Sequence, residues 1–145
     1  MAAERWASVT WRGDLMSGAG TIDEVGSRAF GPLDVSWAAR AEDASGGKTS
    51  PEELIAAAHA SCFAMALSHS LAQGGNAPER LQTSAAVTFV PGTGITKVAL
   101  SVRGTVPGLD ADSFQAAAEA AREGCPVSQA LAAVPEITLD ASLDS

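Results

Sequence analysis

The first forty residues carry a hydrophobic pattern with a period of two. Large and polar residues alternate in ERWASVTWRG (4–13), again in PLDVSWAAR (32–40), and more weakly between them in GAGTIDEVG (18–26). Alternation of this kind is typical of β-strands with one buried face. The glycines between the segments suit hairpin turns. We therefore expect three short strands at the N-terminal end of the chain.

The pattern changes to a helical period after residue 50. Ser50 is a favoured N-cap residue, Pro51 suits the first helical position, and Glu53 stands where a capping box places its glutamate. Small and apolar residues then recur at helical spacing, namely Leu54, Ala58, Cys62 and Met65, with Leu67 and Leu71 nearby. The segment QGGNAP (73–78) ends the run. This stretch predicts a long helix with these residues on its apolar face.

Alternating and helical segments continue to the C-terminus. We expect strands at 81–90, 94–106 and 136–143, and helices within 107–124, capped near Asp110 or Asp112, and within 125–134. The residues PGTG between the first two of these strands predict a hairpin. The resulting order βββ-α-ββ-α-α-β has few tight βαβ units, so it indicates an α+β fold. A length of 145 residues favours one domain over 1–145.

Charge excludes several classes of function. The net charge is −8 and the isoelectric point is near 4.5, which argues against binding to nucleic acid or to an anionic membrane. The first residues lack the apolar run of a secretory signal. The long low-charge segment 54–75 is amphipathic and contains both histidines, so we do not interpret it as a membrane span. These features favour a cytoplasmic location.

The chain is poor in bulky apolar side chains. Leu, Ile, Val and Phe total 29 of 145 residues, whereas alanine occurs thirty times. A core built from so few large residues is completed most easily by burying surface against a second copy. We therefore expect a homo-oligomer, with a dimer favoured because it is the commonest symmetric assembly.

The two cysteines differ in their local setting. Cys62 lies ten residues beyond Glu52, about 15 Å along the helix, where the helix dipole has faded. A reactive Cys62 therefore needs a nearby cation to lower the pKa of its thiol. Cys125 precedes Pro126 and is predicted to be the N-cap of a short helix, a position that favours the thiolate.

Four roles for the cysteines are open from the residues alone. Cys62 can be a small buried hydrophobe, or the pair can form a structural disulfide, which a reducing compartment disfavours. His59, Cys62 and Cys125 can form a three-ligand zinc site, whereas His69 is about 15 Å from His59 and cannot share the ion. The fourth role is a peroxidatic or disulfide-forming pair.

Three segments resemble one known family. SPEELIAAAHASCFAMALS (50–68), ITKVALSVRGTVPGLDADSF (95–114) and EGCPVSQAL (123–131) are similar to the osmotically inducible protein C and organic hydroperoxide resistance (OsmC/Ohr) family. The resemblance extends from about WRGD (11–14) to EITLDASL (136–143). The order of an arginine, PEEL, AHASCF and CPVS is closer to the OsmC branch.

The resemblance implies a thiol peroxidase that uses no metal or organic prosthetic group. The implied fold is α+β, with curved antiparallel sheets wrapped around two long central helices in an intertwined homodimer whose active sites lie at the interface. Cys62 matches the peroxidatic cysteine and Cys125 the resolving one. Arg40 matches the activating arginine, and Glu52 the glutamate that holds it. Arg12 and Arg28 are alternatives to Arg40.

Helical geometry supports this choice of glutamate. At 100° per residue, Glu52 lies about 80° from Cys62 around the helix axis, whereas Glu53 lies about 180° away. A carboxylate can hold an arginine fork bidentately, and the arginine can stabilise both the thiolate and the departing oxygen. His59, one turn before Cys62, is assigned a packing or interface role.

The expected substrates are organic hydroperoxides, with hydrogen peroxide a poorer one, and the expected reductant is an external dithiol. An apolar pocket formed by Phe63, Met65 and other side chains of the helix is expected to hold an alkyl tail. The alternative function is a non-catalytic protein that binds zinc or a small apolar ligand through the same cysteines.

Overall fold

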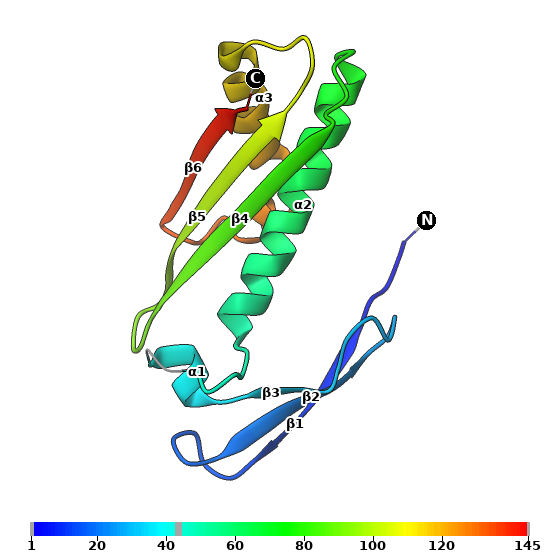
Figure 1. The fold of residues 1–145 in the computed structure, drawn as a ribbon. Coiled ribbons are helices and arrows are strands. Elements are labelled where there is room, and N and C mark those ends of the chain that lie inside the picture. The colour runs from blue at the N-terminus through cyan, green and yellow to red at the C-terminus, as the bar shows by residue number, and fades with distance from the viewer. Residues whose placement is uncertain (1, 43–44, 145) are drawn as a thin grey trace. The chain divides into compact units, whose positions relative to one another are not determined.

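The computed structural model describes residues 2–42 and 45–144, and it divides into two compact units, Met1–Leu54 and Ile55–Ser145. Each unit contains one three-stranded sheet (Figure 1). Together with the helices between the strands, these sheets confirm the predicted α+β class.

The sheet of the first unit consists of β1 (Ala7–Arg12), β2 (Ala19–Val25) and β3 (Leu33–Val35), paired antiparallel in that order. The three predicted strands are confirmed, but the third is shorter than 32–40. The Ser36 hydroxyl accepts a hydrogen bond from the Ala39 N–H at 3.1 Å and caps a short helix, α1 (Trp37–Ala41). The prediction of a strand was therefore wrong from residue 37 onward.

The long helix α2 (Pro51–Gln73) begins and ends where the sequence predicted. Ser50 Oγ accepts a hydrogen bond from the Glu53 N–H at 3.1 Å, as an N-cap residue does. The Glu53 carboxylate accepts one from the Thr49 hydroxyl at 2.8 Å. The described contact of the Glu53 carboxylate is thus with the preceding loop. A capping box would instead place this carboxylate on the Ser50 N–H.

The buried face of α2 differs from the predicted one. Buried side chains recur at every fourth position, at His59, Phe63, Leu67 and Leu71. Ala58 is exposed, Cys62 is half-buried and Met65 is 71% exposed. Alanines flank both faces of the helix, so apolar spacing alone did not distinguish them. Packing selects the face with the larger side chains because it removes more apolar area from water.

Among the described residues, α2 is the one helix long and apolar enough to cross a membrane, a test that the core helix of a soluble protein also passes. Its buried positions contribute to the core of the second unit. Only 22% of its apolar window is buried within the chain.

The sheet of the second unit consists of β4 (Arg80–Val90), β5 (Gly94–Thr105) and β6 (Glu136–Leu143). The hairpin β4–β5 is antiparallel, as predicted, but β6 runs parallel to β5. The expectation of antiparallel sheets is therefore wrong for this pair. The reason is the connection through α3 (Ala111–Gly124) and α4 (Pro126–Ala130), since a helical crossover returns the chain to the end of the sheet where β5 started.

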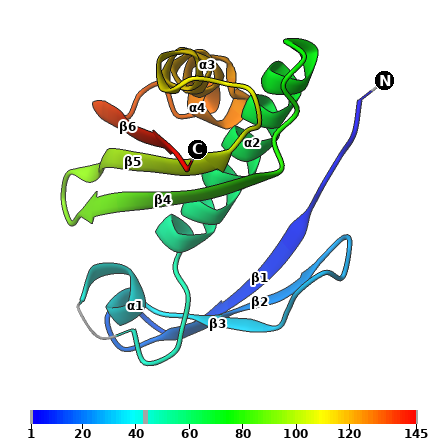
Figure 2. The same ribbon diagram turned by 45° about the horizontal axis from the view of Figure 1, so that its top comes forward.

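The helices α2 and α3 cover one face of this sheet (Figure 2). Val98, Leu100 and Val102 alternate along β5, so their side chains share that face. They form one cluster with Phe63 of α2 and Phe114 of α3. Cys125, at the end of α3, belongs to the same buried cluster, and this places a thiol in the core.

Gly104 on β5 allows the ring of Phe114 to lie against the sheet. A Cβ atom at this position would come within 2.7 Å of two ring carbons of Phe114, which is itself 1% exposed. We therefore expect Gly104→Ala to lower the free energy of unfolding by roughly 1–3 kcal/mol through overpacking. Urea unfolding followed by circular dichroism measures this change.

Gly124→Ala is the matched control, because nothing lies within 4 Å of a Cβ atom built on Gly124. At the last residue of α3, alanine is expected to be neutral or to stabilise by less than about 1 kcal/mol through helix propensity. Equal stabilities of the two variants would contradict the close packing of Phe114 on Gly104.

Candidate active site

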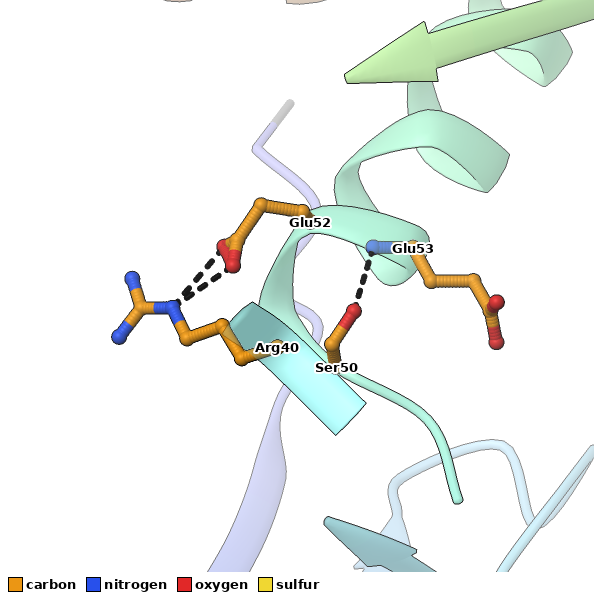
Figure 3. A network of polar contacts seen from close by, with 4 residues as sticks. All are labelled: Arg40, Ser50, Glu52 and Glu53. Carbon is orange, nitrogen blue, oxygen red and sulfur yellow. Dashed lines mark hydrogen bonds and ion pairs between the residues drawn. The ribbon is translucent and has the colours of Figure 1, made fainter. Parts of the chain in front are cut away.

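In the first unit, Arg40 and Glu52 form an ion pair (Figure 3). Arg40 lies in the last turn of α1 and Glu52 in the first turn of α2. Arg40 Nε donates to Glu52 Oε1 at 2.7 Å and to Oε2 at 3.2 Å. The structure thus brings together the arginine and the glutamate that the resemblance implied.

The geometry of this pair differs from a bidentate fork. A single nitrogen, Nε, contacts both carboxylate oxygens, and the two terminal nitrogens of Arg40 point away from Glu52 (Figure 3). Glu52 is 5% exposed, so its carboxylate is largely removed from water and the contact with Arg40 offsets part of the cost of burying it. The carboxylate therefore orients the guanidinium through Nε, the guanidinium nitrogen nearest the backbone.

Arg40 also borders an apolar pocket of about 470 Å³. The pocket lies within the first unit, between the sheet and the chain that leads into α2; it is lined by Val9, Trp11, Leu15, Ile22, Val35, Ser36, Trp37, Arg40, Pro51 and Leu54. A hollow of this kind suits a small apolar ligand with one polar end at the guanidinium.

This pocket is not the one predicted from α2. Phe63 is fully buried in the core of the second unit. Met65 lies on the exposed side of the helix, beside a different hollow that also contains His69. The prediction had both side chains contribute to one pocket, but they project in different directions around the helix axis.

In the second unit, Cys62 and Cys125 are free thiols that hydrogen-bond to each other. Cys62 lies in the middle of α2 and is half-buried, whereas Cys125 is fully buried at the N-cap of α4. The chain thus brings two cysteines that are far apart in sequence into direct contact. Two neighbouring thiols can exchange between dithiol and disulfide.

The two thiols have opposite pKa shifts. Burial, followed by the hydrogen bond with Cys125, raises the pKa of Cys62 above its ordinary value. Burial also raises the pKa of Cys125, but hydrogen bonds from the Cys62 thiol, from the backbone N–H groups of Ser128 and Val127, and from the Ser128 hydroxyl outweigh it and lower the pKa overall. Cys125 is therefore the better thiolate within this unit, as its N-cap position predicted.

Sequence reasoning missed Ser128, which links the thiols to His59. His59 Nε2 lies 2.7 Å from Ser128 Oγ, and the imidazole is fully buried. Burial lowers the pKa of His59, so the ring is neutral at pH 7. The sequence signal for Ser128 was its place in Cys-Pro-Val-Ser, three residues after Cys125, because residues three apart at the start of a helix lie on the same side of it.

The zinc alternative finds no support in the geometry. Within residues 2–42 and 45–144, no group of three His, Cys, Asp or Glu side chains is placed to hold a metal ion. His59, Cys62 and Cys125 thus do not converge on one point, since the Nε2 atom of His59 faces Ser128.

Comparisons with known proteins find relatives of this chain both by sequence and by fold. A family model described as OsmC-like protein matches residues 44–140. The protein named Peroxiredoxin OsmC from Escherichia coli (strain K12) is 41% identical over 148 residues, which cover 100% of both chains. A Shigella flexneri protein of the same name has the same identity and coverage.

Solved structures share the fold at lower identity. The OsmC like protein from Mycoplasma pneumoniae has a TM-score of 0.71 at 11% identity and covers 99% of both chains. The Organic Hydroperoxide Resistance Protein OhrB of Bacillus subtilis has a TM-score of 0.65 at 24% identity, over 96% of this chain and 98% of that one. These two likenesses concern the fold alone.

Proposed function

This chain belongs to the OsmC family, and we propose that it is a thiol peroxidase that reduces organic hydroperoxides through Cys62 and Cys125. The observation that carries the proposal is the contact between two free thiols, one half-buried and one buried, in a chain 41% identical over its full length to a protein named Peroxiredoxin OsmC.

The cycle has three steps. The Cys62 thiolate attacks the terminal oxygen of the hydroperoxide, an S–O bond forms as the O–O bond breaks, and the alkoxide takes up a proton to leave as an alcohol. The Cys125 sulfur then attacks the Cys62 sulfenic acid, which gives a disulfide and water. An external dithiol finally restores both thiols by exchange.

Activation of Cys62 requires a cation. Burial and the neighbouring thiol raise the pKa of Cys62, which disfavours the attacking thiolate. Arg40, oriented by Glu52, is the proposed cation, and it also stabilises the oxygen that departs from the peroxide. Since these groups come from both compact units, the proposal requires that residues 1–145 work as one functional domain.

We further propose a cytoplasmic homodimer with its active sites at the interface. Large apolar side chains are exposed on the described chain and would gain by burial against a second copy. In the first unit they include Trp6, Met16 and Phe30, and on α2 they include Met65. The low burial of α2 within the chain supports the same assembly.

The pocket beside Arg40 predicts a preference for alkyl hydroperoxides. Purified, pre-reduced protein with excess dithiol is expected to reduce cumene hydroperoxide with a kcat/KM at least about tenfold above that for hydrogen peroxide. The reason is that the aryl-alkyl group moves from water into the apolar pocket. Peroxide consumption measures both rates.

Leu15→Ser tests whether this pocket is the origin of the preference. Leu15 lines the pocket and is 53% exposed, so its replacement leaves the core intact. We expect a lower kcat/KM for cumene hydroperoxide and an unchanged value for hydrogen peroxide. A wild-type protein that consumes neither peroxide would contradict the proposed function itself.

A further inference from the structure

Among the residues that the structure describes, the mechanism above leaves one buried titratable group unused, namely His59. His59 lies on the buried face of α2. Phe63 follows one turn further along this face, and Leu67 follows one turn after that. An apolar residue would fill such a site at lower desolvation cost than an imidazole. Its only hydrogen bond among the described residues joins Nε2 to Ser128 Oγ at 2.7 Å. A role beyond packing therefore has to pass through Ser128.

Ser128 connects this imidazole to the resolving thiol. Ser128 lies three residues after Cys125 at the start of α4, and its hydroxyl is among the groups that lower the pKa of Cys125 by donating to the thiolate. When Cys125 is a neutral thiol, the oxygen of the same hydroxyl can instead accept the thiol proton. Cys125 in turn lies beside Cys62. His59, Ser128, Cys125 and Cys62 thus form a continuous chain of polar groups through the second unit. Three of these four side chains are buried, so the chain is shielded from bulk water.

The second step of the cycle needs such a chain. Cys125 attacks the Cys62 sulfenic acid as a thiolate, and the thiol proton has to leave before or during the attack. We propose that His59 accepts this proton through the Ser128 hydroxyl and so promotes formation of the Cys62–Cys125 disulfide. This inference rests on the proposed two-cysteine function. Because His59 acts through Ser128 and does not touch the reacting sulfur atoms, it is a positioning residue.

The step is balanced in atoms and charge. The Cys125 S–H proton moves to Ser128 Oγ while the hydroxyl proton of Ser128 moves to His59 Nε2. The Cys125 sulfur then forms the S–S bond as the S–O bond of Cys62 breaks, so Cys125 is oxidised and the sulfenic sulfur is reduced. The departing hydroxide takes a proton from solvent and leaves as water. His59 returns its extra proton to solvent, and the enzyme gains no net charge.

Burial lowers the pKa of His59, so the resting ring is neutral and has a lone pair for an incoming proton. The same burial disfavours the imidazolium, so the proton is held only briefly before it is passed on. Ser128 also lines a cavity of about 290 Å³ with Arg122, Glu123 and Gln129. This hollow borders Ser128 and provides a route by which the proton returns to solvent.

Three substitutions separate a proton role from a packing role. His59→Gln keeps a similar length and a hydrogen-bonding group for Ser128 but cannot accept a proton. Ser128→Ala removes the hydroxyl at little cost in volume, and it keeps the test meaningful if His59→Gln does not fold. Ser128→Thr restores a hydroxyl and is the rescue variant. Circular dichroism establishes that each variant is folded.

Each protein is mixed rapidly with one equivalent of cumene hydroperoxide and quenched at successive times. Dimedone labelling followed by mass spectrometry measures the Cys62 sulfenic acid, and a thiol count measures the disulfide. We expect His59→Gln and Ser128→Ala to form sulfenic acid at the wild-type rate but to form the disulfide roughly 10²-fold more slowly. Ser128→Thr is expected to recover most of the wild-type rate.

The outcomes distinguish this inference from the proposed function. If sulfenic acid forms and resolves at the wild-type rate in both His59→Gln and Ser128→Ala, the peroxidase proposal stands and His59 only packs. If Ser128→Thr is as slow as Ser128→Ala, shape and not the hydroxyl matters, and the relay is wrong. If the wild-type protein forms no sulfenic acid on Cys62, the proposed function fails and the inference falls with it.

Discussion

Replacing Cys62 by serine is expected to abolish reduction of hydroperoxides, whereas replacing Cys125 stops the cycle after its first step. A hydroxyl at residue 62 is a far weaker nucleophile than a thiolate and does not form a sulfenic acid. With serine at 125, the sulfenic acid forms but has no intramolecular partner. After one equivalent of cumene hydroperoxide, pre-reduced wild-type protein should lose two thiols, Cys125→Ser one and Cys62→Ser none.

The reverse pattern has a definite meaning, because Cys125 is the better thiolate within its own unit. Loss of a thiol in Cys62→Ser but not in Cys125→Ser would assign the attack on peroxide to Cys125. Unchanged thiol counts in all three proteins would show that the pair has a packing or ligand role. Metal analysis of the purified protein would then test the zinc alternative.

Arg40→Ala is expected to lower kcat/KM for cumene hydroperoxide by about 10²–10³-fold, the typical cost of removing one group that stabilises charge in the transition state. Arg40→Lys should recover only part of this loss, because lysine has no Nε–H to meet both oxygens of Glu52. Glu52→Gln should have a smaller effect, since the cation stays but is less firmly oriented. Initial rates of peroxide consumption under excess dithiol measure all three.

Arg12→Ala and Arg28→Ala are the matched controls in the same unit. Arg12 lines a separate polar hollow with Asp23, Asp34 and Lys48, away from the apolar pocket. Both variants should retain the wild-type rate. A full rate in Arg40→Ala with a loss in either control would move the activating role to that arginine. Because Arg40→Ala leaves the buried carboxylate of Glu52 unpaired, thermal unfolding has to be measured alongside.

The family, and with it the proposed reaction, could be read from short segments. The motifs around Cys62 and Cys125 carried the resemblance, and the comparisons confirmed it over the whole chain. The partnership of Arg40 and Glu52 was implied by the same resemblance. The geometry of this pair was not implied. Which nitrogen of Arg40 contacts Glu52, Nε or a terminal one, depends on where α1 ends relative to the start of α2 within the first unit.

Apart from α1, the local elements were determined by the sequence alone, since their signals lie within a few residues of one another. Ser50 with Pro51 marked the start of α2, Asp110 capped α3 through the Ser113 N–H at 2.7 Å, and Cys125 with Pro126 marked the start of α4. Caps and hairpin turns satisfy backbone groups of their own segment, so no distant residue is needed to recognise them.

Tertiary structure alone decided which surfaces meet. It selected Phe63 and Leu67 over Ala58 and Met65 as the buried face of α2, and it made β6 parallel to β5. It also joined His59 to Ser128, 69 residues away. In a chain with thirty alanines, several helix faces have similar apolar patterns. The choice among them depends on the shape and burial offered by distant elements, and no local pattern contains that information.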